Sequence, residues 1–337
     1  MTDYFRPIAQ IDPSRPKGAL TLAGGWCWFD RVEKMTRGGD SQIIGVADLP
    51  ALVRDRLTAP RDSLAGLDLN AAPRIMGILN VTPDSFSDGG VFNAPDAALA
   101  RAREMVDEGA DILDIGGEST RPGADTVAVR AETARTAPLI AAIRASGDKT
   151  PISLDTRKAA VGRTGLDAGA DLINDVAAFT YDPALADVVA QARAPVCLMH
   201  AQGDPKTMQD APSYEDVVLD VYDFLEKSII LAGEKGIPRA RIVVDPGIGF
   251  GKTKAHNLAL LNRISLFHAL GCPILLGASR KRFIGEIAQA PDPAQRAPGS
   301  VAVALAAIYQ GVQILRVHDI GDTWQALAMS TAIFKGN

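Results

Sequence analysis

Residues 96–118 read DAALARAREMVDEGADILDIGGE, and this stretch contains the unit from which the fold can be predicted. Apolar residues recur at helical spacing as far as Val106, which predicts a helix over residues 96–108. Gly109 follows, as is common at helix ends, because glycine adopts the left-handed conformation at little cost. Residues 111–115 then form a short apolar run, which is typical of a strand buried on both faces.

The same succession of helix, glycine and apolar run recurs from residue 74 to the end of the chain. Strands are predicted at residues 74–79, 111–115, 151–154, 171–173, 195–199, 241–244, 273–276 and 313–317. Strands that alternate with helices and are joined by short loops indicate parallel βαβ units. Eight such units predict an α/β fold, a closed (β/α)8 TIM barrel, with an open doubly wound sheet as the alternative.

Residues 1–73 do not follow this pattern. They contain the pairs Gly24-Gly25 and Gly38-Gly39 and several prolines, and only residues 48–57 could form a short helix. We therefore predict an N-terminal extension of unknown role over residues 1–73, interpreted as packing against the rest of the chain. Residues 74–337 then form the catalytic barrel domain, which is close to the usual size of such a barrel.

Composition excludes several classes of protein. The chain has 337 residues, of which 47% are hydrophobic and 22% charged, so it is not a disordered chain. The net charge of -5 without clustered cations argues against a nucleic-acid partner. Cys27, Cys197 and Cys272 form no C-x-x-C pair, so we expect reduced thiols in the cytoplasm rather than disulfides or zinc. No signal peptide is expected, and residues 298–315 are predicted to be a buried helix and strand rather than a membrane span.

Polar residues follow the predicted strands, at the end where barrel enzymes hold their active sites. They are Asn80, Asp155, Asn174, Asp245, Lys281, Arg316 and His318. The carboxylates of Asp155 and Asp245 and the amide of Asn174 would suit a polar heterocycle that offers N–H donors and carbonyl acceptors. Each of these residues could instead cap a helix. The cations follow the last two strands, where barrels usually bind phosphate. Asn80 is a neutral oxygen donor that would suit Mg²⁺ bridging to a phosphate.

Residues 247–253 read GIGFGKT and are similar to a phosphate-binding loop, but the match fails. Pro246 stands where the first glycine of that motif belongs, and Lys252 replaces the last glycine of the dinucleotide motif. We interpret the stretch as a glycine-rich loop that lets the backbone approach a ligand.

Two long motifs lie in the loops after the first two predicted strands. Residues 78–90 read ILNVTPDSFSDGG, and residues 114–123 read DIGGESTRPG. Shorter segments follow in order, namely DTRK at 155–158, DPG at 245–247, SRK at 279–281 and RVHD at 316–319. Together these segments resemble the dihydropteroate synthase family of pterin-binding enzymes over about residues 74–337. The resemblance is specific, because motifs agree on at least six separate loops.

The resemblance implies a transferase of folate and tetrahydrofolate biosynthesis. It would join 6-hydroxymethyl-7,8-dihydropterin diphosphate to p-aminobenzoate and release 7,8-dihydropteroate and pyrophosphate. The family also implies Mg²⁺ as the cofactor, a homodimer, and inhibition by sulfonamides. An electron-rich pterin can stabilise a positive methylene carbon, so a dissociative step without a strong general base is expected.

The resemblance also implies roles for individual residues. The catalytic residues would be Lys281, Arg316 and His318. The pterin diphosphate would be bound by Thr120, Asp155, Asn174, Met199, Asp245, Lys281, Arg316 and His318, and Mg²⁺ by Asn80. The p-aminobenzoate would be bound by Phe86, Thr120, Arg121, Pro122 and Arg282. Arg282 departs from the serine that many members carry, and its guanidinium could pair with the p-aminobenzoate carboxylate.

Two alternatives remain open at this point. A pterin-binding methyltransferase barrel of the corrinoid type would keep the carboxylates and amides but needs no pyrophosphate site. A non-catalytic pterin-binding paralogue would keep the pocket and need no catalytic cations. The SRK and RVHD segments argue against the first, and the presence of Asn80, Lys281 and Arg316 argues against the second.

Overall fold

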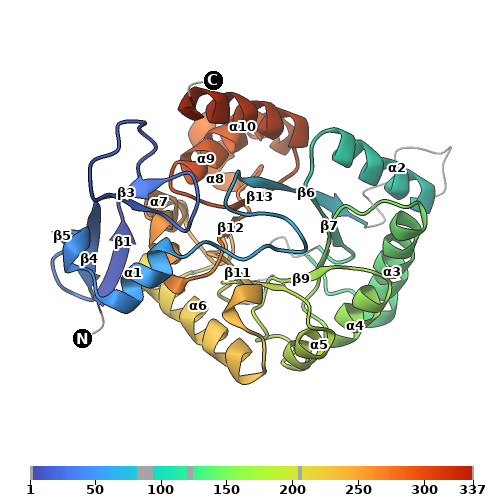
Figure 1. The fold of residues 1–337 in the computed structure, drawn as a ribbon. Coiled ribbons are helices and arrows are strands. Elements are labelled where there is room, and N and C mark those ends of the chain that lie inside the picture. Colours follow the sequence, from blue (N-terminus) through green and yellow to red (C-terminus); the bar gives the residue numbers. More distant parts are fainter. Residues whose placement is uncertain (1–2, 82–93, 120–123, 204–206, 336–337) are drawn as a thin grey trace.

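The computed structural model describes residues 3–81, 94–119, 124–203 and 207–335. Its core is an eight-stranded parallel sheet in the order β11-β10-β9-β8-β7-β6-β13-β12. A further parallel bridge pairs Val244 with Ile274 and joins the two ends of this sheet, so the barrel is closed. Figure 1 shows the strands at the centre with helices around them. The prediction of a (β/α)8 barrel is confirmed.

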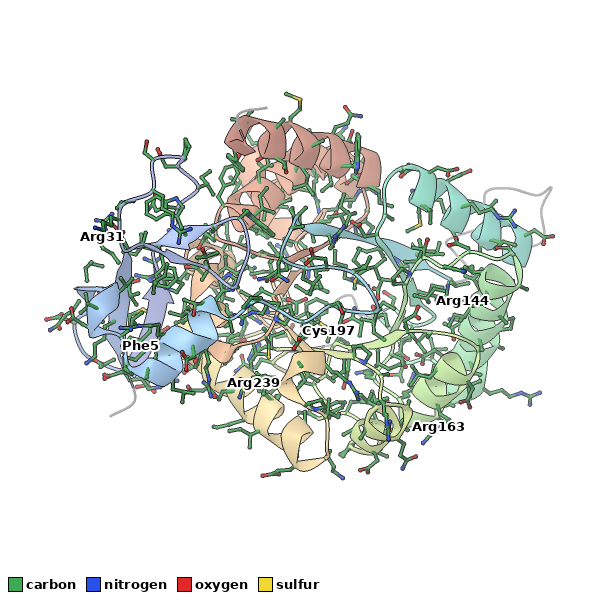
Figure 2. All side chains as sticks on the ribbon, in the orientation of Figure 1. Phe5, Arg31, Arg144, Arg163, Cys197 and Arg239 are labelled. Carbon is green, nitrogen blue, oxygen red and sulfur yellow. The ribbon has the colours of Figure 1, made fainter. Side chains whose placement is uncertain are left out.

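The barrel strands lie within two residues of their predicted bounds. They are β6 (Arg74–Asn80), β7 (Ile112–Gly116), β8 (Ile152–Asp155), β9 (Leu172–Asp175), β10 (Val196–Met199), β11 (Ile242–Asp245), β12 (Leu275–Leu276) and β13 (Ile314–Val317). Every residue of β7 to β11 is buried. Helices cover the outer face of these strands, and side chains from the other strands fill the inside of the barrel. Cys197 of β10, labelled near the centre of Figure 2, is one of these buried residues.

The helices of the barrel form its outer ring. They are α2 (Ala94–Asp107), α3 (Val129–Ala145), α4 (Ala159–Asp167), α5 (Ala184–Ala192), α6 (Val217–Glu234), α7 (Lys254–Asn262), α8 (Arg282–Ala288), α9 (Ala297–Ile308) and α10 (Ile320–Lys335). Gly109 and Gly169 take positive φ angles of 106° and 111° between a helix and the next strand, as the sequence predicts. No helix of the described residues is long and apolar enough to cross a membrane.

The N-terminal extension forms a small sheet beside the barrel (Figure 1). Strands β1 (Asp3–Pro7), β4 (Arg31–Thr36) and β5 (Gln42–Gly45) pair antiparallel, and β2 (Leu20–Thr21) pairs with β3 (Trp28–Phe29). A 3-10 turn, η1 (Val46–Asp48), precedes the helix α1 (Ala51–Thr58), which lies near the predicted residues 48–57. The sequence did not predict these strands, because charged residues interrupt the apolar residues of β1 and β4 and β5 has no buried residue.

The extension and the barrel share one apolar core. Phe29 and Leu57 belong to the same buried cluster as Phe267, which lies in the 3-10 segment η4 (Ile264–Leu270) after α7. The hydrogen bonds that cross this contact include one from Ser265 Oγ to the carbonyl of Pro7 at 2.8 Å and one from Trp26 Nε1 to the carbonyl of Ile308 at 2.8 Å. The extension is therefore fixed to the barrel by apolar and polar contacts.

Candidate active site

The inward-facing side chains of the strands change from apolar to polar along the barrel. Near the amino ends they are apolar and pack with two leucines that precede β6, in one cluster of Leu64, Leu69, Met76, Ile112, Leu172, Cys197, Val243, Leu275 and Ile314. Side chains alternate between the two faces of a strand, so residues two positions further along point to the same interior. At five of these seven positions the chain carries Asp114, Asn174, Met199, Asp245 and Arg316, and at the other two Ile78 and Gly277. The barrel is filled at its amino end and becomes polar at its carboxyl end, where barrel active sites lie.

Arg316 is the central cation of this polar layer. Its Nε donates to Asp114 Oδ2 at 2.6 Å, and its Nη2 lies 2.7 Å from Asp155 Oδ2. The side chain of Asn174 also reaches Asp114, with Nδ2 3.4 Å from each carboxylate oxygen. Burial alone would lower the pKa of Arg316. The carboxylates of Asp114 and Asp155 raise the pKa by more than burial lowers it, so the guanidinium is charged. The structure thus brings together Asp155, Asn174 and Arg316 from three predicted strand ends.

One guanidinium shared by two buried carboxylates leaves the layer with excess negative charge. Burial is the main cause that raises the pKa of Asp155 to about 7; Arg316 lowers it, and Asp114 raises it again. Asp155 is only 6% exposed, so solvent contributes little to stabilising its charge. Carboxylates in this state are suited to accept hydrogen bonds from a ligand that carries several N–H donors.

Asp245 and Lys281 lie on the other side of Arg316. A Cβ atom built on Gly277 would lie 3.7 Å from both Asp245 Oδ2 and Arg316 Cδ, so these side chains face each other across a glycine. Burial raises the pKa of Asp245, and the bond from the Gly247 amide to Asp245 Oδ1, at 2.7 Å, lowers it. Lys281 Nζ donates to the carbonyl of Ile248 and lies 4.0 Å from the ring centroid of Phe250.

The remaining predicted residues lie around this centre. Asn80 ends β6, and a Cβ built on Gly116 would lie 3.6 Å from both Asn80 Oδ1 and Asp155 Cβ. Met199 ends β10 and pairs in register with Asp245. His318 follows β13, and its Nδ1 lies 3.0 Å from Ser279 Oγ. These contacts join the predicted metal ligand and the predicted anion-binding residues to the same mouth.

Of the residues predicted to bind p-aminobenzoate, only Arg282 is among the described residues. Arg282 is exposed, with 89% of its side chain accessible, and its Nε lies 2.8 Å from Glu286 Oε1 one turn along α8. Phe86, Thr120, Arg121 and Pro122 lie outside the described residues. Their assignment stays a prediction from the resemblance.

The glycine-rich loop after β11 makes its closest contacts with protein. Gly247, Gly249 and Gly251 all have positive φ angles, and a Cβ at Gly247 would lie 1.8 Å from the carbonyl oxygen of His200. A Cβ atom built on Gly249 would lie 2.7 Å from Lys281 Cδ. The loop therefore packs against the end of β10 and against the lysine, and glycine is required for both contacts.

Two groups of site residues escaped the sequence reasoning. Asp114 lies within β7 rather than at its end, and the signal that could have found it is a charge inside a strand that is otherwise apolar. Lys252, only 3% exposed, has its Nζ 2.8 Å from His200 Nδ1 and 3.0 Å from the carbonyl oxygen of Phe250. Burial lowers the pKa of Lys252. Burial, followed by the charge of Lys252, lowers the pKa of His200 to about 2, so the imidazole is neutral.

A buried ion network anchors the segment between β7 and α3. Lys158 Nζ lies 2.5 Å from both Glu118 Oε2 and Glu132 Oε2, and it donates to the carbonyl of Val127 at 2.7 Å. Arg157 Nη2 lies 2.9 Å from Glu118 Oε1. Breaking such a network by removing one partner is strongly destabilising, so these residues fix the loop ends beside Asp155.

Comparisons with known proteins agree with this geometry. The model of the family described as pterin binding enzyme matches residues 76–318. A Synechocystis protein named dihydropteroate synthase is 46% identical over 261 residues, which are 77% of this chain and 90% of that protein. The solved Xanthomonas albilineans dihydropteroate synthase with 4-aminobenzoic acid has a TM-score of 0.76 at 47% identity and covers 82% of this chain and 98% of its own. The same enzyme in complex with 7,8-dihydropteroate has a TM-score of 0.74 at 44% identity, covering 81% and 98%.

The raised pKa of Asp155 predicts a pH-dependent effect of Asp155→Asn on stability. A carboxyl group whose pKa is higher in the folded than in the unfolded state stabilises the fold at low pH, and this contribution is lost as the pH rises through about 7. At pH 5 the neutral carboxyl resembles the amide, whereas at pH 8 the wild type holds an uncompensated charge. The free energy of unfolding of the variant, relative to the wild type, should therefore increase from pH 5 to pH 8.

Denaturant unfolding of the ligand-free proteins at pH 5, 6, 7 and 8 measures this difference. Asp187→Asn is the control, because Asp187 lies on α5 with half of its side chain exposed beside Lys235. Its effect should be small at every pH. A relative stability of Asp155→Asn that stays flat or falls with pH would contradict the excess charge at Arg316.

Proposed function

The chain belongs to the pterin-binding enzymes and acts as a dihydropteroate synthase, and we propose how its barrel mouth performs this reaction. The observation that carries the proposal is Arg316 bound to Asp114 and Asp155. Asn174, Asp245 and Lys281 surround this cluster. The carboxylates and the amide offer acceptors and donors for the edge of a pterin ring, and the cations offer charge for a diphosphate.

The substrates would divide the mouth between them. Asp155, Asn174, Asp245 and Lys281 would hold the pterin edge by hydrogen bonds, with Met199 against the ring and Arg316 stacked on it. Arg316 and His318, with Thr120, would hold the diphosphate. Ser279 supports this assignment, because its hydroxyl lies 3.0 Å from His318 Nδ1 and fixes the orientation of the imidazole. The p-aminobenzoate would be bound by Phe86, Thr120, Arg121, Pro122 and Arg282.

The reaction needs charge stabilisation more than proton transfer. The bond between the pterin methylene carbon and the diphosphate oxygen breaks, and the amine nitrogen of p-aminobenzoate forms the new bond to that carbon. Pyrophosphate leaves, and the amine proton passes to water. Lys281, Arg316 and His318 would act by neutralising the charge that develops on the leaving oxygen. No general base is required, because an aromatic amine attacks in its neutral form.

The proposal is tested by measuring pyrophosphate release. The purified protein with Mg²⁺, 6-hydroxymethyl-7,8-dihydropterin diphosphate and p-aminobenzoate should release one pyrophosphate for each 7,8-dihydropteroate formed. Omission of either substrate should abolish the release, and a sulfonamide should inhibit it competitively with p-aminobenzoate. Pterin binding without pyrophosphate release would favour a non-catalytic paralogue, and methyl transfer from a methylated folate to a corrinoid would favour a methyltransferase.

Magnesium is the proposed metal, and the chemistry of the mouth is compatible with it. Among the described residues no group of three or more His, Cys, Asp or Glu side chains could hold a metal. Mg²⁺ is usually bound by one or two protein oxygens together with substrate phosphates and water, so the amide oxygen of Asn80 is a suitable ligand. When bound, the ion would neutralise charge on the diphosphate.

Replacing Asn80 should weaken the response to magnesium. Asn80→Ala should raise the Mg²⁺ concentration that gives half-maximal turnover by about tenfold, because one protein ligand is lost. Asn70→Ala is the control, since Asn70 lies before β6 and binds the Arg61 backbone. Titration of turnover with Mg²⁺ measures the effect, and an unchanged midpoint would remove Asn80 from the metal site.

We also propose a homodimer formed through the last helices. Four large apolar side chains of α10 and the end of α9 are exposed, namely Tyr309, Trp324, Met329 and Ile333. Helices α9 and α10 lie at the top of Figure 1, on the outside of the barrel. Exposed large apolar side chains on neighbouring helices are typical of interfaces between subunits.

Charges placed on this surface should separate the subunits. Met329 and Ile333 are 62% and 70% exposed, so Met329→Glu combined with Ile333→Glu should leave the fold intact. Sedimentation of the wild type should give twice the chain mass of 35.5 kDa, and the double variant should give the monomer mass. Leu52→Glu on α1 is the control, because Leu52 is equally exposed on the extension. A monomeric wild type would contradict the proposal.

The cysteines support a reducing compartment. Cys27, Cys197 and Cys272 are all free and buried. Burial raises the pKa of Cys27 to about 12 and that of Cys272 to about 11, so both remain thiols and take no part in the chemistry. We therefore propose that the enzyme acts in the cytoplasm.

A further inference from the structure

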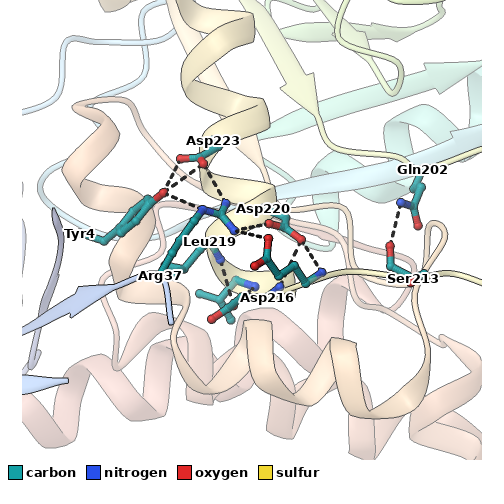
Figure 3. A network of polar contacts seen from close by, with 10 residues as sticks. Tyr4, Arg37, Gln202, Ser213, Asp216, Leu219, Asp220 and Asp223 are labelled. Atoms are coloured by element: carbon teal, nitrogen blue, oxygen red, sulfur yellow. Dashed lines mark hydrogen bonds and ion pairs between the residues drawn. The ribbon is translucent and has the colours of Figure 1, made fainter. Parts of the chain in front are cut away.

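The N-terminal extension contacts the first turns of α6 through Arg37 and Tyr4. Arg37, which follows β4, has its Nη1 2.6 Å from Asp220 Oδ1 and its Nη2 2.8 Å from Asp223 Oδ2. Its Nε donates to Tyr4 Oη at 3.2 Å, and this hydroxyl donates in turn to Asp223 at 3.0 Å. Figure 3 shows that Tyr4 and Arg37 approach the helix from the extension, and that the two aspartates belong to α6.

Asp220 connects this contact to the loop between β10 and α6. Its second oxygen, Oδ2, accepts from the backbone amides of Glu215 and Asp216 at 3.0 and 3.3 Å. Asp216 caps α6 by accepting from the amides of Val218 and Leu219. Arg37 therefore orients the carboxylate that holds the last residues of the loop.

The loop in turn lies against the glycine-rich loop after β11. Tyr214 Oη donates to the carbonyl of Gly251 at 2.7 Å, and its ring packs against His200 with centroids 5.9 Å apart. Gln209 Nε2 donates to the carbonyl of Gly249 at 2.5 Å. The side chain of Gln202 donates to the Ser213 carbonyl at 3.0 Å and ties the start of the loop to its end (Figure 3).

The glycine-rich loop determines where Lys281 can lie. Lys281 donates to the carbonyl of Ile248, and its aliphatic chain packs on Gly249 so closely that a Cβ there would meet it at 2.7 Å. Lys252, which belongs to this loop, holds it in place because its Nζ contacts His200 Nδ1 and the carbonyl of Phe250. A continuous series of contacts thus runs from Arg37 in the extension to the lysine proposed to bind substrate.

We propose that Arg37 is a positioning residue for the pterin diphosphate site, and that the extension acts on substrate binding through it. The inference rests on the proposed function, because the proposed function assigns Lys281 to the pterin diphosphate. The contacts end at the side of the mouth that contains Lys281 and Asp245. The expected effect is therefore on the pterin diphosphate and not on p-aminobenzoate.

The chain offers a matched control for loss of packing. Arg56 of α1 also joins the extension to α6, with its Nη1 3.1 Å from Glu226 Oε1. The two ion pairs are similarly exposed, at 31% and 26% for Arg37 and Asp220 against 26% and 26% for Arg56 and Glu226. Glu226 lies further along α6, and its ion pairs are with Arg56 and Arg239. Arg56→Met should therefore lower stability without disturbing the loop.

The test compares Arg37→Met, Arg37→Lys, Arg56→Met and the full-length wild type. Calorimetric titration with 6-hydroxymethyl-7,8-dihydropterin diphosphate, without p-aminobenzoate, should give a Kd about three- to tenfold higher for Arg37→Met. Arg37→Lys should recover part of the affinity, because an ammonium can still pair with one aspartate. Arg56→Met should bind like the wild type, and the KM for p-aminobenzoate should be unchanged in all variants.

Amide hydrogen exchange provides a readout that does not depend on substrate. Residues 209–216 and 249–252 should exchange faster in Arg37→Met than in the wild type, and at the wild-type rate in Arg56→Met. Equal changes in Kd or exchange for the two methionine variants would overturn the inference and leave the extension with a packing role only. A wild type that does not bind the pterin diphosphate would overturn the proposed function, and this inference with it.

Discussion

The structure depends on one buried cation that is shared by two carboxylates. Arg316 from the last barrel strand bonds to Asp114 from the second and Asp155 from the third, and so joins strands that are far apart in sequence. A buried charge is tolerated only when it is paired, and removal of one partner leaves the others unpaired at high cost. The same three groups carry the geometry of the proposed pterin site. Stability and substrate binding therefore rely on one set of contacts, and the excess carboxylate is relieved when a ligand supplies donors.

The loops depend on a second constraint, which is close backbone contact. The glycines at positions 247, 249 and 251 take left-handed conformations and allow the loop after β11 to touch the end of β10 and Lys281. Three glycines leave this loop with few side chains of its own, so contacts from neighbouring segments help to hold it. Within the loop, Lys252 contacts His200 and the carbonyl of Phe250, and Tyr214 and Gln209 contact the loop from the segment between β10 and α6. The extension reaches that preceding loop through Arg37 and Asp220.

Much of the fold was predictable because the barrel repeats a simple pattern. Each strand is a short apolar run and glycine ends several helices, so the bounds of β6 to β13 were placed within two residues. The polar strand ends were found for the same reason. Asp114 was missed because it lies inside β7, and only the alternation of the two faces shows that it points inward with Asn174 and Arg316. The strands of the extension were missed because charged residues interrupt the apolar residues of β1 and β4, and β5 has no buried residue.

The arrangement of polar and apolar layers explains why one sequence can be both stable and reactive. At the amino end, Leu64 and Leu69 pack on the inward residues of seven strands and close the barrel with apolar contacts. Two residues further along, four of these strands present Asp114, Asn174, Asp245 and Arg316 in the same inward direction. A substitution in the apolar layer at the amino end would change packing, and one in the polar layer at the carboxyl end would change charge. Only two residues along a strand separate the two layers. Because the apolar layer holds the strands in register, the upper layer can keep an unbalanced charge that a substrate compensates.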